Sequence, residues 1–170
     1  MRTWAIPLLC TVCLFAESAA GVRWTAPAGW KSEGTRPMRA ASYAVPATQP
    51  DTENGECVVY FFGAGQGGGI EANIERWKGQ FQSAGKPPAA KVNKKTVNTL
   101  AVTTVDMSGT YTGMGGPMAV QKTARPGYRL LGAIIEAPGG NLFVKFTGPA
   151  KTVGANQQRF EQFVASFRKN

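Results

Sequence analysis

The segment spanning residues 56–81 constrains the fold more than any other part of the sequence. Residues 56–62 (ECVVYFF) are rich in β-branched and aromatic side chains, as buried strands are. Residues 63–69 (GAGQGGG) supply the backbone freedom for a sharp turn. After this turn the apolar residues recur at helical spacing, as Ile70, Ile74, Trp77 and Phe81. We therefore expect a strand, a glycine turn and an amphipathic helix over residues 70–84.

The glycine turn also matches the spacing of a dinucleotide-binding motif, at Gly63, Gly65 and Gly68. Such a site also needs an acidic residue about 20 positions further along to hold a ribose, but residues 83–105 contain no Asp or Glu. Two glutamates in the first turns of the expected helix would also oppose a phosphate group there. We therefore interpret the glycines as a structural turn and predict no cofactor.

Most of the remaining chain alternates short strand-like runs with turn residues. The last two of these runs are expected to pair as a hairpin through the turn at residues 137–140, and another hairpin is expected to turn near Asn98. A loop is expected at residues 108–117, because they contain four glycines. The expected strands are residues 22–25, 38–45, 56–62, 91–96, 100–107, 118–122, 128–136 and 141–147.

The C-terminal residues 152–169 predict a second helix. Their apolar side chains form one stripe, made of Val153, Phe160, Phe163, Val164 and Phe167. Thr152 is the expected N-cap, and Arg168 and Lys169 would lie at the negative end of the helix dipole. Strand, helix and strand do not alternate along the chain, which disfavours a parallel sheet. The sequence therefore predicts one α+β domain, residues 21–170, with a single antiparallel sheet covered by helices.

Residues 1–20 are typical of an export signal. Arg2 precedes an apolar run of about 13 residues, and small residues follow up to Ala20. The run is shorter than the roughly 20 residues that cross a bilayer as a helix. We therefore expect cleavage after Ala20, a periplasmic or secreted protein, and no permanent membrane span. Cys57 is then the only cysteine of the three that remains, and its place in a strand predicts a buried side chain.

The formal net charge is +9 and the chain contains no histidine. The positive charge favours anionic ligands or polymers, but the basic residues are scattered and form no nucleic-acid-binding module, so nucleic acid is disfavoured. The absence of histidine excludes Ser-His-Asp and Cys-His catalysis and the usual zinc sites. We predict no catalytic residue and no metal site.

Asn73, Arg76 and Gln80 follow one another at spacings of three and four and form a polar stripe beside the apolar one. This stripe, with Gly65, Gly67 and Gly68 in the preceding loop, is the predicted binding site for a carboxylate, a sugar or a partner. The same side chains would equally serve as hydrogen-bonded support for neighbouring loops.

The opening residues 24–30 (WTAPAGW), the antiparallel middle and the closing residues 160–167 (FEQFVASF) resemble the PsbP/Mog1-like α-β-α sandwich. Residues 73–81 (NIERWKGQF) also resemble an Asn-x-x-Arg-Trp-x-x-Gln-Phe segment in a family of uncharacterised exported bacterial proteins. Members of the sandwich group act mainly as accessory or adaptor proteins. The resemblance therefore implies binding without identifying a partner.

Together these observations predict an exported, non-catalytic accessory or binding domain for an envelope protein or a small polar or anionic ligand. One alternative is an enzyme with a cleft between the glycine loop 63–69 and the loop 108–117. Another alternative is electrostatic attachment to anionic envelope polymers through the net charge of +9.

Overall fold

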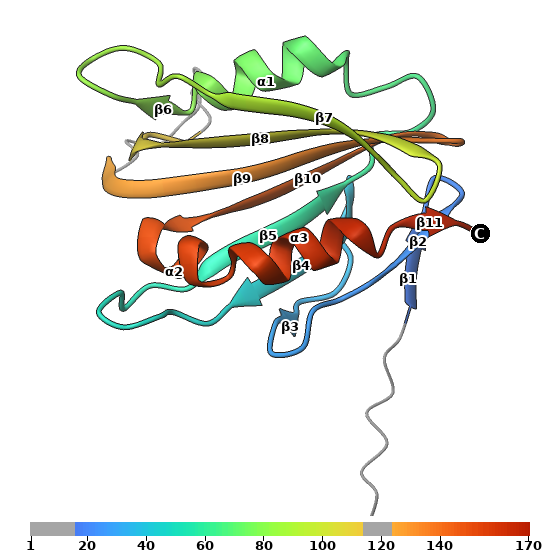
Figure 1. The fold of residues 1–170 in the computed structure, drawn as a ribbon, viewed down its shortest axis with the longest axis horizontal. Coiled ribbons are helices and arrows are strands. Elements are labelled where there is room, and N and C mark those ends of the chain that lie inside the picture. Colours follow the sequence, from blue (N-terminus) through green and yellow to red (C-terminus); the bar gives the residue numbers. More distant parts are fainter. Residues whose placement is uncertain (1–15, 114–123) are drawn as a thin grey trace, which may run out of the picture.

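An antiparallel sheet of eight strands forms the centre of the protein (Figure 1). The computed structural model describes residues 16–113 and 124–170. The strands follow the order β3-β4-β5-β10-β9-β8-β6, and β7 also pairs with β8. Their bounds in that order are Lys31–Ser32, Arg39–Val45, Gly55–Tyr60, Gly140–Pro149, Arg125–Ala137, Leu100–Tyr111 and Phe81–Gln82, with β7 at Lys91–Val97.

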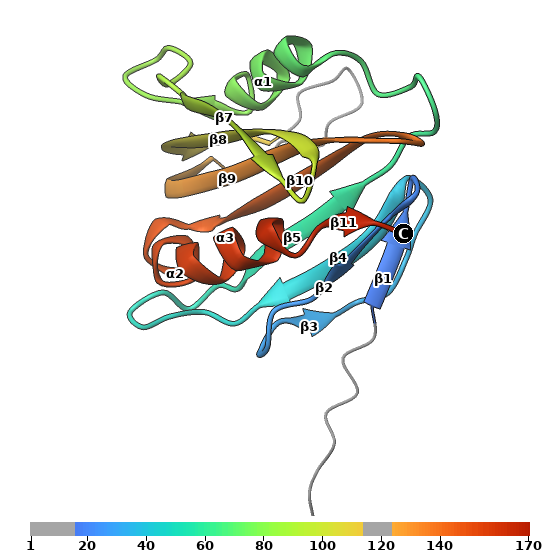
Figure 2. The ribbon, with the colours of Figure 1, turned by 45° about the vertical axis from the view of Figure 1, so that its right-hand side comes forward.

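A second, three-stranded sheet lies beside the first (Figure 2). It joins β1 (Ala16–Ala19) and β11 (Arg168–Lys169) to either side of β2 (Val22–Thr25). Three short helices complete the fold: α1 (Ile70–Lys78), α2 (Ala150–Ala155) and α3 (Gln157–Ala165). Figure 1 shows α1 on one side of the large sheet and α2 and α3 on the other.

The alternation of side chains along the strands builds a separate core on each face of the large sheet. In β10, Leu142, Val144 and Phe146 belong to the larger cluster, which the aromatic residues of α3 and the small sheet complete. Phe143 points to the opposite face and joins the smaller cluster under α1. Of the described helices, α1 therefore packs on one face of the large sheet, and α2 and α3 pack on the other.

The expected α+β fold with a single sheet covered by helices is wrong. The protein has two sheets and is mostly β, because its helices span only nine, six and nine residues. The second sheet exists because β11 returns from the far end of the chain to pair with β2, as Arg168 with Arg23 and Lys169 with Val22. The expected antiparallel arrangement is confirmed, since each described strand pair is antiparallel.

Both expected helices are shorter than predicted. Helix α1 begins at Ile70 but is capped by Gly79, and Phe81–Gln82 form β6 instead of a further turn. The backbone explains this end, because the Gln80 carbonyl accepts a hydrogen bond from Thr112 N at 2.8 Å beside β8.

The C-terminal helix is divided at Asn156, and its last two expected residues form β11. Thr152 is not the N-cap, because α2 begins at Ala150. Instead, the Asp51 carboxylate accepts hydrogen bonds from both the backbone N and Oγ1 of Thr152, each at 2.7 Å. An acidic side chain from a distant loop thus supports the start of the helix.

The expected hairpins are confirmed, with β9 paired to β10 and β7 paired to β8, and the latter turns at Asn98 and Thr99. The buried side chain expected for Cys57 is also confirmed. The loop expected at 108–117 is wrong for residues 108–111, which belong to β8. The rest of that loop from residue 114, and the strand expected at 118–122, lie outside the described residues.

Residues 16–19, which fall within the expected export signal, form β1 and pair with β2. The Glu17 carboxylate accepts a hydrogen bond from Trp24 Nε1 at 3.0 Å and another from the Tyr43 hydroxyl. Partial burial raises the pKa of Glu17 above its usual value, although the Trp24 hydrogen bond opposes the shift. In the described parts of the chain, no helix has the length and hydropathy required to cross a membrane.

Candidate functional site

A cavity of about 610 Å³ lies on the α1 side of the large sheet. Helix α1 has nine residues and is about 13 Å long, whereas β10 has ten residues and extends about 33 Å. The helix is therefore too short to cover the full length of the strands on this face. We call the space the α1-face cavity, and it is lined by Pro37, Met38, Arg39, Asn54, Glu56, Val58, Tyr60, Phe62, Asn73, Arg76, Trp77, Gln80, Tyr111, Arg125, Tyr128, Phe143, Lys145 and Thr147.

Aromatic rings form two walls of this cavity. Tyr60 and Phe62 stack with their ring centroids 5.9 Å apart, at the end of β5. Tyr111 of β8 and Tyr128 of β9 stack at 5.8 Å. Because the two pairs stand on different strands, the cavity presents apolar ring surface from more than one direction.

The charge of the lining is predominantly positive. Four basic side chains, Arg39, Arg76, Arg125 and Lys145, line the cavity together with one acidic side chain, Glu56. Arg39 forms an exposed ion pair with Glu56 at 2.7 Å, and Arg125 pairs with Glu53 beside the cavity. Exposed pairs of this kind hold the two arginines only weakly. The potential inside the cavity therefore favours an anion.

Each of three basic groups also lies over a tyrosine ring of the lining. The Arg39 guanidinium lies 5.6 Å from the Tyr60 ring centroid and the Arg125 guanidinium 5.8 Å from that of Tyr128. Lys145 Nζ lies 5.2 Å from the Tyr111 ring centroid. Cation–π contacts hold the charged groups next to the apolar walls, so charge and ring surface are offered together.

Arg76 is held by Asn73, its neighbour in the predicted stripe. Arg76 Nη1 donates to Asn73 Oδ1 at 2.9 Å, and Asn73 Nδ2 donates to the carbonyls of Gly67 at 2.8 Å and Gly69 at 2.9 Å. The side chain of Asn73 is buried, whereas Arg76 is exposed. Asn73 thus supports the glycine loop. Within residues 16–113 and 124–170, no carboxylate forms an ion pair with Arg76.

Gln80 lies beyond the end of α1 but still reaches the cavity. Its buried side-chain Oε1 accepts a hydrogen bond from Lys145 Nζ, which rises from the middle of β10. Lys145 Nζ also lies 3.5 Å from the Tyr111 hydroxyl. The structure therefore brings Asn73, Arg76 and Gln80 to one cavity, with two of them holding basic groups.

The three predicted glycines lie in the loop that precedes α1. Gly65, Gly67 and Gly68 all have positive φ, and none of them is among the described residues that line the cavity. A Cβ on Gly67 would lie 2.7 Å from a ring carbon of Phe62 and 2.7 Å from one of Phe143. This glycine is therefore required by the close approach of the loop to the aromatic wall.

The tyrosines of the cavity remain protonated at neutral pH. Burial raises the pKa of both Tyr60 and Tyr111 above the usual value. Burial and a hydrogen bond to Glu53 raise the pKa of Tyr128. The hydroxyl groups of Tyr60 and Tyr111 are therefore hydrogen-bond donors to an anion instead of bases, whereas the Tyr128 hydroxyl already donates to Glu53 Oε2 at 2.6 Å.

Two further lining residues have unusual surroundings. Thr147 Oγ1 is buried, and it has no hydrogen-bond partner among the described residues. Met38 has 62% of its surface exposed. Its φ is 65°, a backbone conformation that residues other than glycine rarely adopt. An unpaired buried hydroxyl and a strained, exposed apolar residue in one cavity are both typical of a binding site.

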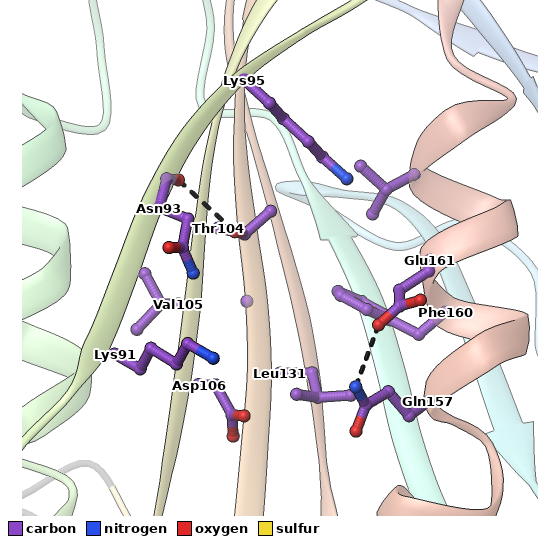
Figure 3. Close-up of a pocket in the computed structure, with 12 residues that line it drawn as sticks. Lys91, Asn93, Lys95, Thr104, Val105, Asp106, Leu131, Gln157, Phe160 and Glu161 are labelled. Atoms are coloured by element: carbon purple, nitrogen blue, oxygen red, sulfur yellow. Dashed lines mark hydrogen bonds between the residues drawn. The ribbon is translucent and has the colours of Figure 1, made fainter.

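A second, smaller cavity of about 220 Å³ lies between β7 and α3. Figure 3 shows Lys91 and Lys95 extending into it from β7, with Glu161 on the side of α3. Gln157 Nε2 donates to Glu161 Oε1 at 2.9 Å across one turn of α3. The two lysines and Glu161 are exposed, so this β7–α3 cavity is a solvated groove with mixed charges.

Sequence reasoning missed the strand residues of the α1-face cavity. Lys145 interrupts an apolar strand, and its alternation with Val144 and Phe146 was a signal that it faces away from the main core. Tyr111 lay in the expected loop, and Arg125 lay between two expected strands. Their convergence depends on strand pairing over long sequence separations, which local patterns do not encode. In the described residues, no group of three or more His, Cys, Asp or Glu side chains is placed to hold a metal ion.

Comparison with solved structures identifies the fold. Cyanobacterial PsbP (CyanoP) of Synechocystis is similar with a TM-score of 0.53 and 10% identity, over 92% of this chain and 91% of that one. A Pseudomonas aeruginosa protein of unknown function, described as a putative regulator, is similar with a TM-score of 0.49 and 14% identity, over 89% and 94% of the two chains. No protein-family model and no curated protein sequence matches this chain. The chain thus has a PsbP-like fold, as its sequence resemblance implied, and at 10% identity the likeness shows the fold alone.

Proposed function

We propose that the protein is an exported, non-catalytic binding domain that holds a small ligand with an anionic group in the α1-face cavity. The observation that carries this proposal is the lining, in which four basic side chains and one acidic side chain surround a space of about 610 Å³. That volume lies in the usual range for small-molecule sites, roughly 300–1,000 Å³. Export is inferred from residues 1–20, which have the charge and hydropathy pattern of a signal peptide.

The chemistry of the lining supports binding over catalysis. Its tyrosines have raised pKa values, because they are buried, and do not act as bases near neutral pH. The chain has no histidine, and Cys57 belongs to the core on the opposite face of the sheet. The available groups donate hydrogen bonds and positive charge, which is what an anion requires.

The proposal is tested by capture of small molecules from an envelope extract, detected by native mass spectrometry. We expect the wild-type protein to retain a ligand, and the Thr147→Phe variant, in which a larger side chain fills the cavity, to lose it. Arg76→Ala should weaken capture while lowering the free energy of unfolding by only about 1 kcal/mol, because one partly exposed hydrogen bond is lost.

Circular dichroism and urea denaturation serve as the controls for folding of both variants. Equal capture by the wild type and a folded Thr147→Phe variant would show that the ligand binds elsewhere. A loss of about 2–5 kcal/mol in Arg76→Ala, comparable to truncation of a core side chain, would mark Arg76 as a structural residue.

A further inference from the structure

From the arrangement of charge and rings in the α1-face cavity, we infer that its ligand is a small aromatic anion, with a planar aromatic body and a carboxylate-like group. This inference rests on the proposed function and specifies the chemical class of the ligand. It requires two things of the lining: a basic group prepared to meet an anion, and ring surface placed to meet an aromatic body. The described residues supply both.

Arg76 is the group prepared for the anion. Among the described residues, its guanidinium is bound only through Nη1, to the buried amide of Asn73, and that amide is itself fixed by two carbonyls of the glycine loop. A guanidinium has five N–H donors, so the remaining donors can bind a carboxylate in a defined orientation. An arginine whose position is set by a buried neutral group contributes charge without a competing carboxylate.

Lys145 provides a second basic group at the floor of the cavity. It is oriented by Gln80 Oε1 and lies above the Tyr111 ring, so its position is determined from two directions. Arg76 stands on α1 and Lys145 on β10, and these elements form the roof and the floor of the cavity. Arg76 on α1 and Lys145 on β10 can therefore contact an anionic group of the ligand from opposite sides of the cavity.

The aromatic pairs recognise the body of the ligand. Tyr60 stacks on Phe62 with an angle of 6° between the rings, and Tyr111 stacks on Tyr128 with an angle of 8°. A planar aromatic body can pack against the edges of these rings and against the cations that lie over three of them, and such contacts are stronger than those of an aliphatic body of equal size. The exposed side chain of Met38 adds a polarizable apolar contact. An inorganic anion would leave these surfaces unused.

The test uses three matched probes in isothermal titration calorimetry at pH 7. They are 2-naphthoate, its neutral analogue 2-naphthamide, and decalin-2-carboxylate, which keeps the charge but has saturated rings. We expect naphthoate to bind about 10-fold more tightly than naphthamide, because only the anion forms ion pairs with the basic lining in addition to hydrogen bonds. We expect it to bind about 3-fold more tightly than decalin-2-carboxylate, because only the aromatic rings form ring–ring and cation–π contacts.

The Arg76→Gln variant should lose most of the preference for naphthoate over naphthamide, because the affinity for the anion falls further than the affinity for the amide. Lys94→Gln is the matched control, because Lys94 is an exposed residue of β7 that does not line the cavity and its removal changes the net charge equally. A preference that falls equally in both variants would reflect the overall field of the protein and would overturn the assignment to Arg76.

Equal affinity for naphthoate and naphthamide, tighter binding of decalin-2-carboxylate, or no binding of naphthoate would overturn the ligand class. These failures are distinct from failure of the proposed function. An aliphatic anion captured from extract by the wild type, and lost in Thr147→Phe, would leave the proposed function intact and remove only the inference that the ligand is aromatic.

Discussion

Asn73 and Arg76 are three residues apart on α1, yet their surroundings give them different roles. Asn73 is 2% exposed and its amide nitrogen donates to two carbonyls of the glycine loop. Arg76 is exposed, and its hydrogen bond to Asn73 Oδ1 directs the guanidinium without neutralising it. The buried amide therefore stabilises the loop and the exposed cation remains available to a ligand.

Glu17 allows the contribution of a single carboxyl group in β1 to be measured. Burial raises its pKa above 4.5, so the folded protein binds the proton more tightly than the unfolded chain does. The ionised Glu17 carboxylate, which is present at high pH, is less favourable in the folded protein than in the unfolded chain. The free energy of unfolding contributed by Glu17 therefore rises as the pH falls from above its raised folded-state pKa to below its unfolded-state pKa.

We expect the Glu17→Gln variant of the full chain, which retains residues 1–20, to lack this rise. Urea denaturation of both proteins between pH 4 and pH 7 gives the difference in stability, which should shift in favour of the wild type as the pH falls. The exposed Glu136→Gln substitution in β9 controls for a general change of charge. A wild-type advantage that is constant with pH, or that shrinks as the pH falls, would contradict the role of Glu17.

At the scale of elements, a close contact between Gly132 and Trp77 sets the position of α1 on the sheet. A Cβ added to Gly132 of β9 would lie 2.4 Å from Trp77 Cζ3, and Trp77 lines the α1-face cavity. The missing side chain on the strand thus leaves room for the largest side chain of the helix. The shape of the cavity depends on this contact.

Gly132→Ala should therefore lower the free energy of unfolding by about 1–3 kcal/mol, because Trp77 must move away from the strand. It should also weaken ligand capture. Gly154→Ala in α2 is the matched control, since its Cβ would have its nearest contact at 3.7 Å, and it should raise stability by about 0.5–1 kcal/mol. Chemical denaturation of both variants checks this, and a neutral Gly132→Ala would show that α1 is not fixed there.

Elements whose signals are local could be predicted, and elements that depend on distant partners could not. The hairpin of β9 and β10 has strand patterning and a turn within one stretch of sequence, and it was expected correctly. Strand β11 has only two residues and exists because β2 lies beside it. The stop of α1 at Gly79 likewise depends on the bond from Thr112 to Gln80. Helical patterning contains no information about either partner.

In the candidate site, too, the residues with a local sequence signal could be predicted and those brought in by distant strands could not. Helical spacing predicted that Asn73, Arg76 and Gln80 would lie together, and all three line the α1-face cavity. That prediction assumed a helix through Gln80, whereas the residue reaches the cavity from the turn after α1. Lys145 and Tyr111 come from strands that meet α1 only in the folded protein. The sequence therefore indicated one wall of the site and not the opposite one.

At the scale of the whole molecule, the two faces of the large sheet are used differently. The α2 and α3 side is filled by the larger core cluster, in which Trp24, Phe146 and Phe163 are almost fully buried. The α1 side is only partly covered and keeps the cavity with its basic lining. The fold thus combines one face that supplies stability with another that is open to a ligand.

The net charge is +9, and basic residues also lie outside the cavity. Two modes of binding, to anionic polymers on the surface or to a ligand in the cavity, would therefore differ in their dependence on salt. Attachment to anionic polymers would use scattered surface residues such as Lys91, Lys94 and Lys95 of β7, which are exposed. That binding would collapse as the salt concentration rises, since charges more than about 10 Å apart are screened near 0.1 M salt. A ligand enclosed by aromatic walls would depend on salt much less.

The central claim is that binding takes place in the α1-face cavity, and chemical-shift mapping tests it most directly. Uniformly ¹⁵N-labelled protein is titrated with the small-molecule fraction of an envelope extract at 0.15 M salt, and amide shifts are recorded. We predict saturable shifts concentrated at Arg76, Gln80, Tyr111 and Lys145, and absent from the Thr147→Phe variant. Shifts concentrated on β7 and α3, or spread over the basic surface, would contradict the account.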